Sequence, residues 1–153
     1  MAQKRDVVRI IRLLVMIQLF FLSVQFILGM WINLFANVTN PSSSENHLQY
    51  MSYVMSSFPE IMVHIAIGII IGIISLILIA FSVKYKRIKI LVISIANAIF
   101  VFLAGISGIL FLINFMSNNI FSFLMSISFL AVILADFSIV LYIPVPSSSS
   151  SMG

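Results

Sequence analysis

Four long apolar stretches constrain the fold of this chain more than any other feature. They cover residues 13–35, 61–83, 90–113 and 120–143. A helix needs about 20 mainly apolar residues to cross the hydrocarbon of a bilayer. These stretches are rich in isoleucine and phenylalanine, but an open sheet cannot satisfy its edge groups in lipid. The sequence therefore predicts an all-α integral membrane protein, a bundle of four transmembrane helices.

The composition agrees with a chain that faces lipid. Only 8% of the residues are charged and the mean hydropathy is +1.24, whereas a soluble domain carries about 25% charged residues. Cysteine is absent, which excludes disulfides and thiolate metal sites. We expect one transmembrane domain over residues 1–143 with an outer loop at 36–60. The serine-rich residues 144–153 are expected to form a disordered cytoplasmic tail.

The basic residues predict the orientation of the helices. All eight fall in two clusters, each beside an apolar stretch: Lys4, Arg5, Arg9 and Arg12, then Lys84, Lys86, Arg87 and Lys89. Cytoplasmic loops of membrane proteins carry an excess of such residues. We therefore expect both termini in the cytoplasm (N-in/C-in), in a multi-pass protein of the plasma membrane. Basic residues placed in this way do not indicate a nucleic-acid partner.

The outer loop contains one amphipathic segment. Its apolar residues are spaced three or four apart: Leu48, Met51, Val54, Met55 and Phe58. This spacing predicts a short helix, either on the outer leaflet or across the end of the bundle. Asn37, Val38 and Thr39 form a glycosylation sequon.

Small and polar residues mark the expected packing faces, because helices in lipid associate through close backbone approach and polar contacts. Gly68 and Gly72 form a GxxxG pair in the second stretch, and Gly105 and Gly108 mark the third. The first stretch carries Gln18, Gln25, Gly29 and Asn33 along one side, and the fourth repeats Ser128, Ala131, Ala135 and Ser138. Each helix is thus expected to turn one small or polar face inward.

Three polar residues are expected to meet inside the membrane. Asp136 is the one acid well inside an apolar stretch, and it lies about 10 Å from the stretch's inner end at ~1.5 Å per residue. Gln18 and Asn97 fall at about 8 and 10 Å from theirs. We predict an intramembrane cluster of Asp136, Asn97 and Gln18 with the acid protonated. It would serve as a structural clasp, a proton-handling group or a contact to a partner subunit.

His64 is the candidate ligand-binding residue of the chain. It follows Glu60 by four residues, so carboxyl and imidazole share a helix face and can hydrogen-bond. Such a partner fixes the tautomer of a histidine that binds a metal or haem. A haem b would need a second axial ligand, for which His47, Met30, Met62 and Met116 are candidates.

The segment Glu60-Ile-Met-Val-His64, in a chain of four predicted spans, resembles haem A synthase in its half-length, four-helix form. The resemblance implies a haem-binding membrane protein with His64 as ligand. The chain departs from the family in two ways. The family pairs glutamate and histidine at three-residue spacing, and it places a further histidine on another helix, which this chain lacks.

The sequence favours a non-enzymatic, small polytopic membrane protein, an accessory or assembly subunit. Its expected partners are the lipid bilayer and other membrane subunits or further copies of itself, and no cofactor is predicted. Two alternatives remain open: a b-type haem or quinone protein using His64, and a small proton-coupled permease using Asp136.

Overall fold

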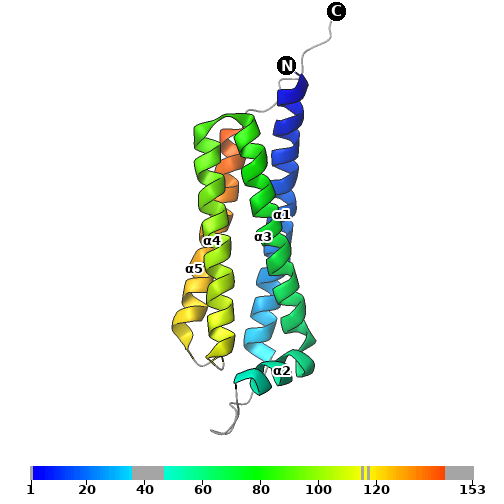
Figure 1. Ribbon diagram of the computed structural model, residues 1–153, viewed down its shortest axis with the longest axis vertical. Helices are drawn as coiled ribbons and strands as arrows, with labels where there is room; N and C mark the ends of the chain where they lie inside the picture. The colour runs from blue at the N-terminus through cyan, green and yellow to red at the C-terminus, as the bar shows by residue number, and fades with distance from the viewer. Residues whose placement is uncertain (1, 36–46, 115, 117, 144–153) are drawn as a thin grey trace, which may run out of the picture.

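Five helices make up the described part of the chain, which in this computed structural model is residues 2–35, 47–114, 116 and 118–143. They are α1 (Ala2–Phe35), α2 (His47–Ser57), α3 (Pro59–Tyr85), α4 (Ile88–Ile113) and α5 (Asn119–Tyr142). The four long helices run alternately in opposite directions as a bundle, and α2 crosses one end (Figure 1). All four are long and apolar enough to span a membrane. The prediction of an all-helical chain with four candidate spans is confirmed for these residues.

Residues at the helix ends explain where the helices begin and end. Pro59 occupies the first turn of α3, where a missing N–H costs no hydrogen bond. Lys86 ends α3 in a left-handed conformation, with its N–H donating to the Val83 carbonyl at 3.2 Å. Asn118 caps α5 by accepting from the N–H of Ile120 at 3.1 Å. These ends fix the turns that reverse the chain.

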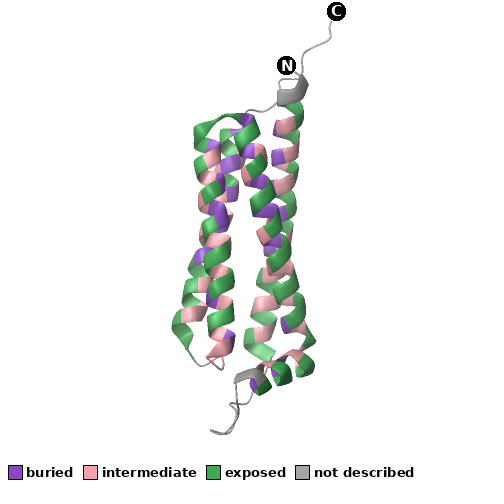
Figure 2. Ribbon diagram, viewed as in Figure 1, coloured by how far each residue is buried: buried purple, intermediate pink, exposed green. Residues whose placement is uncertain are grey.

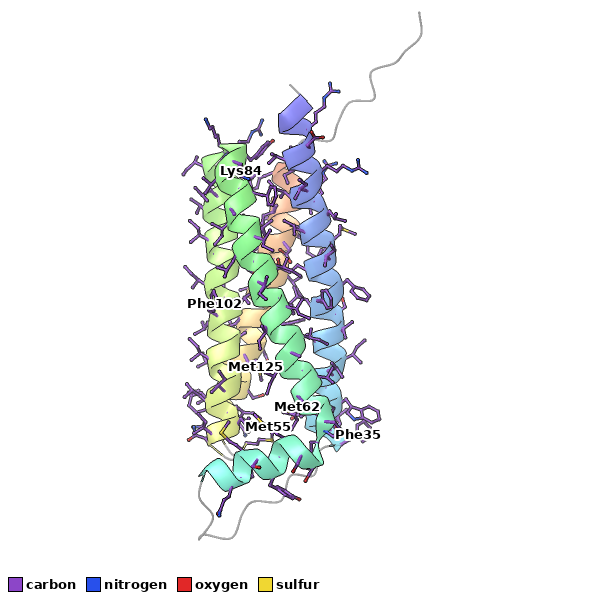
Figure 3. All side chains as sticks on the ribbon, turned by 45° about the vertical axis from the view of Figure 1, so that its right-hand side comes forward. Phe35, Met55, Met62, Lys84, Phe102 and Met125 are labelled. Atoms are coloured by element: carbon purple, nitrogen blue, oxygen red, sulfur yellow. The ribbon has the colours of Figure 1, made fainter. Side chains whose placement is uncertain are left out.

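The two ends of the bundle differ in charge. The start of α1, the turn between α3 and α4 and the end of α5 lie together at one end (Figure 1). We call this the basic end, since Arg5, Arg9 and the cluster at residues 84–89 lie there. Figure 3 shows Lys84 at this end, with Met55 and Met62 at the opposite one. We call the opposite one the α2 end.

The helix α2 packs against the bundle at the α2 end. Tyr50 and Val54 are buried and form one apolar cluster with Ile61 of α3 and Leu112 of α4. Burial also raises the pKa of the Tyr50 phenol. Of the two positions that the sequence left open for this segment, the structure has the one across the end of the bundle.

Buried residues follow the axis of the bundle (Figure 2). They include apolar clusters and polar side chains. An apolar cluster at the basic end includes Val15, Leu78 and Ile139. A second, nearer the middle, is built on Leu22, Ile71 and Val132. Outward-facing side chains of the four long helices are mainly large and apolar, as a bundle in lipid requires.

Two of the expected packing faces are wrong in detail. The buried positions of α5 are Ser128, Val132, Asp136 and Ile139, so the inner face is turned relative to the predicted repeat of Ser128, Ala131, Ala135 and Ser138. Ala131, Ala135 and Ser138 are half-buried beside this face. On α1, Asn33 is exposed. The sequon at Asn37 and the tail at residues 144–153 lie outside the described residues.

Candidate functional site

One polar side chain from each long helix meets in a single layer of the core. The four are Gln18 of α1, Ser75 of α3, Asn97 of α4 and Asp136 of α5, and each is 0% exposed. We call this set the polar layer. It lies between the apolar cluster at the basic end and the cluster nearer the middle.

Asn97 is the hub of the polar layer. Its Oδ1 accepts from Gln18 Nε2 at 2.9 Å and from Ser75 Oγ at 3.0 Å. Its Nδ2 donates to Asp136 Oδ1 at 2.9 Å. Gln18 Nε2 also donates to Ser75 Oγ at 3.0 Å. One asparagine thus connects the polar residues of all four long helices.

Regular spacing along the helices positions this layer. Gln18 lies between Val15 and Leu22, and Ser75 lies between Ile71 and Leu78; these four apolar neighbours are all buried. Steps of three and four residues keep side chains on one face of a helix. The layer is therefore a polar substitution within an apolar seam.

Two oxygens of the polar layer have no hydrogen-bond partner among the described residues. They are Gln18 Oε1 and Asp136 Oδ2, and both are buried. An ionised Asp136 would be an unpaired charge inside the bundle. Burying such a charge costs about several kcal/mol of free energy. The neutral acid instead carries one O–H donor, and the layer has an acceptor left over. Chemically, the layer can hold one proton.

The predicted cluster of Asp136, Asn97 and Gln18 is brought together, and sequence reasoning missed its fourth member. Ser75 is not among the three residues that the sequence predicted to meet. The depth count that grouped the other three would have found it, because Ser75 lies about 12 Å from Val83 at ~1.5 Å per residue. Asp136 Oδ1 accepts from Asn97, and Arg12 Nη2 donates to the Ile143 carbonyl at 3.3 Å.

The seam between α1 and α3 continues from the polar layer in a fixed antiparallel register. A Cβ on Gly68 would lie 3.6 Å from Gln25 Nε2, and one on Gly29 would lie 3.4 Å from His64 Cε1. Gln25 and Gly68 are each seven residues from Gln18 and Ser75, one heptad along both helices. Gly68 and Gly29 thus leave room for the polar side chains opposite them.

The four glycines predicted to pack helices differ from one another in what surrounds them. Gly68 lies against Gln25, and a Cβ on Gly108 would meet Met125 Sδ at 3.4 Å. Gly72 and Gly105 have open space there, with nothing within 4 Å. Gly105 is also exposed, so it does not face a neighbouring helix of this bundle, and its role in helix packing stays a prediction.

His64 is half-buried on α3 and faces Gly29 of α1. Its Nδ1 is buried without a hydrogen-bond partner among the described residues. No hydrogen bond joins it to Glu60 in that part of the chain, so the orienting contact predicted for Glu60 is not formed. Of the candidate axial ligands, Met30 and Met62 are exposed on the outer surface, and Met116 packs against the apolar cluster of Tyr50 and Val54. The side chain of His47 lies outside the described residues.

A metal site built on several ligands is also not found where the structure can be described. Among residues 2–35, 47–114, 116 and 118–143, no three His, Cys, Asp or Glu side chains gather closely enough to hold a metal ion. The polar layer consists of one carboxyl, two amides and one hydroxyl group. It is the best-defined polar site of the described chain.

The comparisons with known proteins add no relative. No protein-family model, no curated protein and no solved structure matches this chain. The function must therefore be argued from the site and the surface alone.

Proposed function

We propose that this chain is a non-enzymatic, multi-pass membrane protein that acts as an accessory or assembly subunit, by packing against other membrane-embedded chains. The polar layer is then a clasp that fixes the register of the four helices. Hydrogen bonds through Asn97 join it to the polar residue of each other long helix, and this supports a structural role over a catalytic one.

The observation that carries the proposal is the position of Gly105. Ala98 and Leu112, one heptad before and after it on α4, are 4% and 6% exposed. Gly105 between them is exposed and has open space at its Cβ position. Large apolar side chains surround this notch on the helix surface, among them Phe102 (Figure 3) and Ile109. A small residue in such a setting allows close approach of another helix.

The charge at the basic end supports the proposed orientation. The alternating directions of the helices bring both basic clusters to one end (Figure 1). The sequence has no Lys or Arg between residues 13 and 83 or after residue 89. By the bias of cytoplasmic loops for Lys and Arg, we infer that the basic end and both termini face the cytoplasm, with the plasma membrane as host.

Replacing Gly105 by isoleucine tests the proposal. We expect the wild-type chain, extracted gently from its own membranes, to have a native mass larger than one chain, and Gly105→Ile to have the mass of one chain. A Cβ at this position has nothing within 4 Å, and isoleucine is a better helix former than glycine. The free energy of unfolding should therefore not fall. Ala66→Ile, at an exposed position of α3, is the matched control and should keep the larger mass. A wild-type chain that is monomeric would overturn the proposal.

A second candidate function rests on His64. Its buried, unpartnered Nδ1 faces the seam between α1 and α3, and imidazole nitrogens bind haem iron or accept hydrogen bonds from quinones. This candidate predicts that protein from haem-replete cells shows a visible haem band, which His64→Ala removes. Val63→Ala, at the neighbouring exposed position, is the control that should leave the band intact. A colourless wild-type protein would rule out the haem form.

A further inference from the structure

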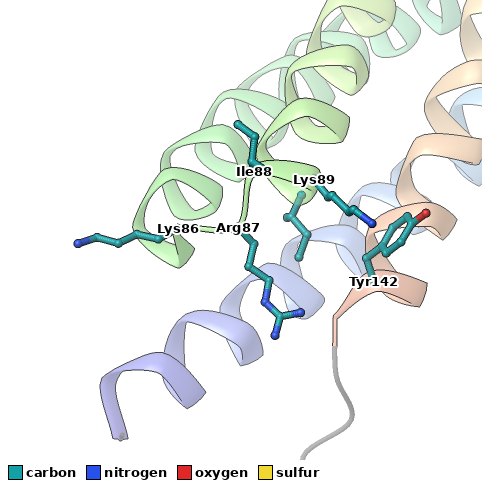
Figure 4. A pocket seen from close by; sticks show the side chains of 6 residues that line it. Lys86, Arg87, Ile88, Lys89 and Tyr142 are labelled. Carbon is teal, nitrogen blue, oxygen red and sulfur yellow. The ribbon is translucent and has the colours of Figure 1, made fainter.

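The basic end carries a hollow where the chain turns from α3 to α4. It measures about 290 Å³ and is lined by Lys86, Arg87, Ile88, Lys89, Ile90 and Tyr142. Three of these six residues are cations and none is an acid. In Figure 4, Lys89 is directed toward Tyr142 while Lys86 points away from both. The charge of the hollow therefore suits an anionic ligand.

Aromatic rings hold the two cations nearest the hollow. Lys89 Nζ lies 5.6 Å from the centre of the Tyr142 ring, and the Arg87 guanidinium carbon lies 5.5 Å from that of Tyr85. A cation over a ring face keeps its N–H donors available at the edges. Arginine and lysine donors of this kind bind phosphate oxygens through charge-assisted hydrogen bonds.

A second hollow continues the first along the outer surface of α4. It also measures about 290 Å³ and is lined by Ile88, Lys89, Val92, Ile93 and Tyr142. Ile88, Lys89 and Tyr142 line both hollows. Val92 is 56% exposed and one helical turn further from the basic end than Ile88. A ligand that fits both hollows has an anionic head and an apolar tail.

We propose that the two hollows together bind an anionic phospholipid, with the phosphodiester at Arg87 and Lys89 and the start of one acyl chain against Val92. Basic pockets at the cytoplasmic face of helical membrane proteins recognise such headgroups. This site does not depend on Gly105 or on the polar layer. It is independent of the accessory-subunit proposal.

Native mass spectrometry of the full chain in neutral detergent tests the site. Phosphatidylglycerol and phosphatidylcholine are added at equal concentration to the wild type, to Arg87→Gln/Lys89→Gln and to Arg5→Gln/Arg9→Gln. The last pair removes the same charge from exposed positions of α1 at the same end. We expect the wild type and the α1 pair to prefer phosphatidylglycerol, and the site pair to bind it about thirtyfold more weakly. Val92→Trp, which fills the apolar hollow, should also weaken retention without changing the charge.

Three results would overturn the inference. Equal losses in the two double variants would show diffuse attraction to a basic surface. Equal retention of phosphatidylcholine would show that the anionic headgroup is not recognised. Displacement of the lipid by inorganic phosphate at the lipid's own concentration would show a site for a soluble anion, in which the acyl chain plays no part.

Discussion

Asn97→Leu should lower the free energy of unfolding of the bundle by about 2–3 kcal/mol. Leucine has the same branched shape, but it removes the three hydrogen bonds of the amide and leaves Gln18, Ser75 and Asp136 without their shared partner. Hydrogen bonds between membrane helices contribute about 0.6 kcal/mol each on average and at most about 1.7. Buried groups left unpaired add to that loss. Reversible unfolding in bicelles, monitored by the separation of the helices, measures this change in free energy.

A matched serine and a double variant make the Asn97 prediction specific. Ser126→Ala removes an exposed hydroxyl that donates a hydrogen bond to the backbone carbonyl of Ser122 in the same helix. It should change the free energy of unfolding by less than about 0.5 kcal/mol. Asn97→Leu combined with Asp136→Leu should cost less than the sum of the two single variants, since both remove the same bond. Additive losses, or a loss in Asn97→Leu no larger than in Ser126→Ala, would show that the layer is not a clasp.

The fold could be predicted from the sequence because lipid leaves few alternatives. A run of apolar residues as long as residues 61–83 must be helical in a bilayer, and α3 begins at Pro59, as a proline at the start of a helix predicts. The amphipathic spacing around Val54 likewise predicted α2. Its place across the bundle end could not be predicted, because that depends on contacts with Ile61 and Leu112, which are far apart in the chain.

The candidate site was predicted in part, and the misses have physical causes. Counting residues from the ends of the predicted spans places Gln18, Asn97 and Asp136 at one level, but it does not give the rotation of each helix. Rotation decides that Ser75 joins the layer and that Gly105 faces outward. A glycine in a sequence indicates close packing without saying whether the neighbour is inside the same bundle or in another chain. The shared i, i+4 face of Glu60 and His64 allowed a contact that the side chains do not make.

The same geometry separates the clasp from proton transport, the third interpretation of the sequence. A clasp needs only an acceptor at Asp136 for the Nδ2 of Asn97. A proton carrier needs a carboxyl that gains and loses its proton, together with a route to both sides. The orphan Asp136 Oδ2 would be the atom that carries that proton. Substitutions that keep the acceptor but remove the acid therefore distinguish the two.

Asp136→Asn should leave the bundle within about 0.5 kcal/mol of the wild type, whereas Asp136→Leu should cost about 2 kcal/mol. The asparagine keeps an oxygen that accepts from Asn97 and adds N–H donors to a layer in which Gln18 Oε1 has no partner among the described residues. The leucine leaves the Asn97 Nδ2 unpaired in an apolar interior. Both variants are compared with the wild type by unfolding in bicelles and by proton-coupled flux in reconstituted vesicles.

A permease would lose flux in Asp136→Asn while staying folded, and that result would replace the accessory role with transport. Equal stability of the asparagine and leucine variants would instead show that Asp136 holds no helix in place.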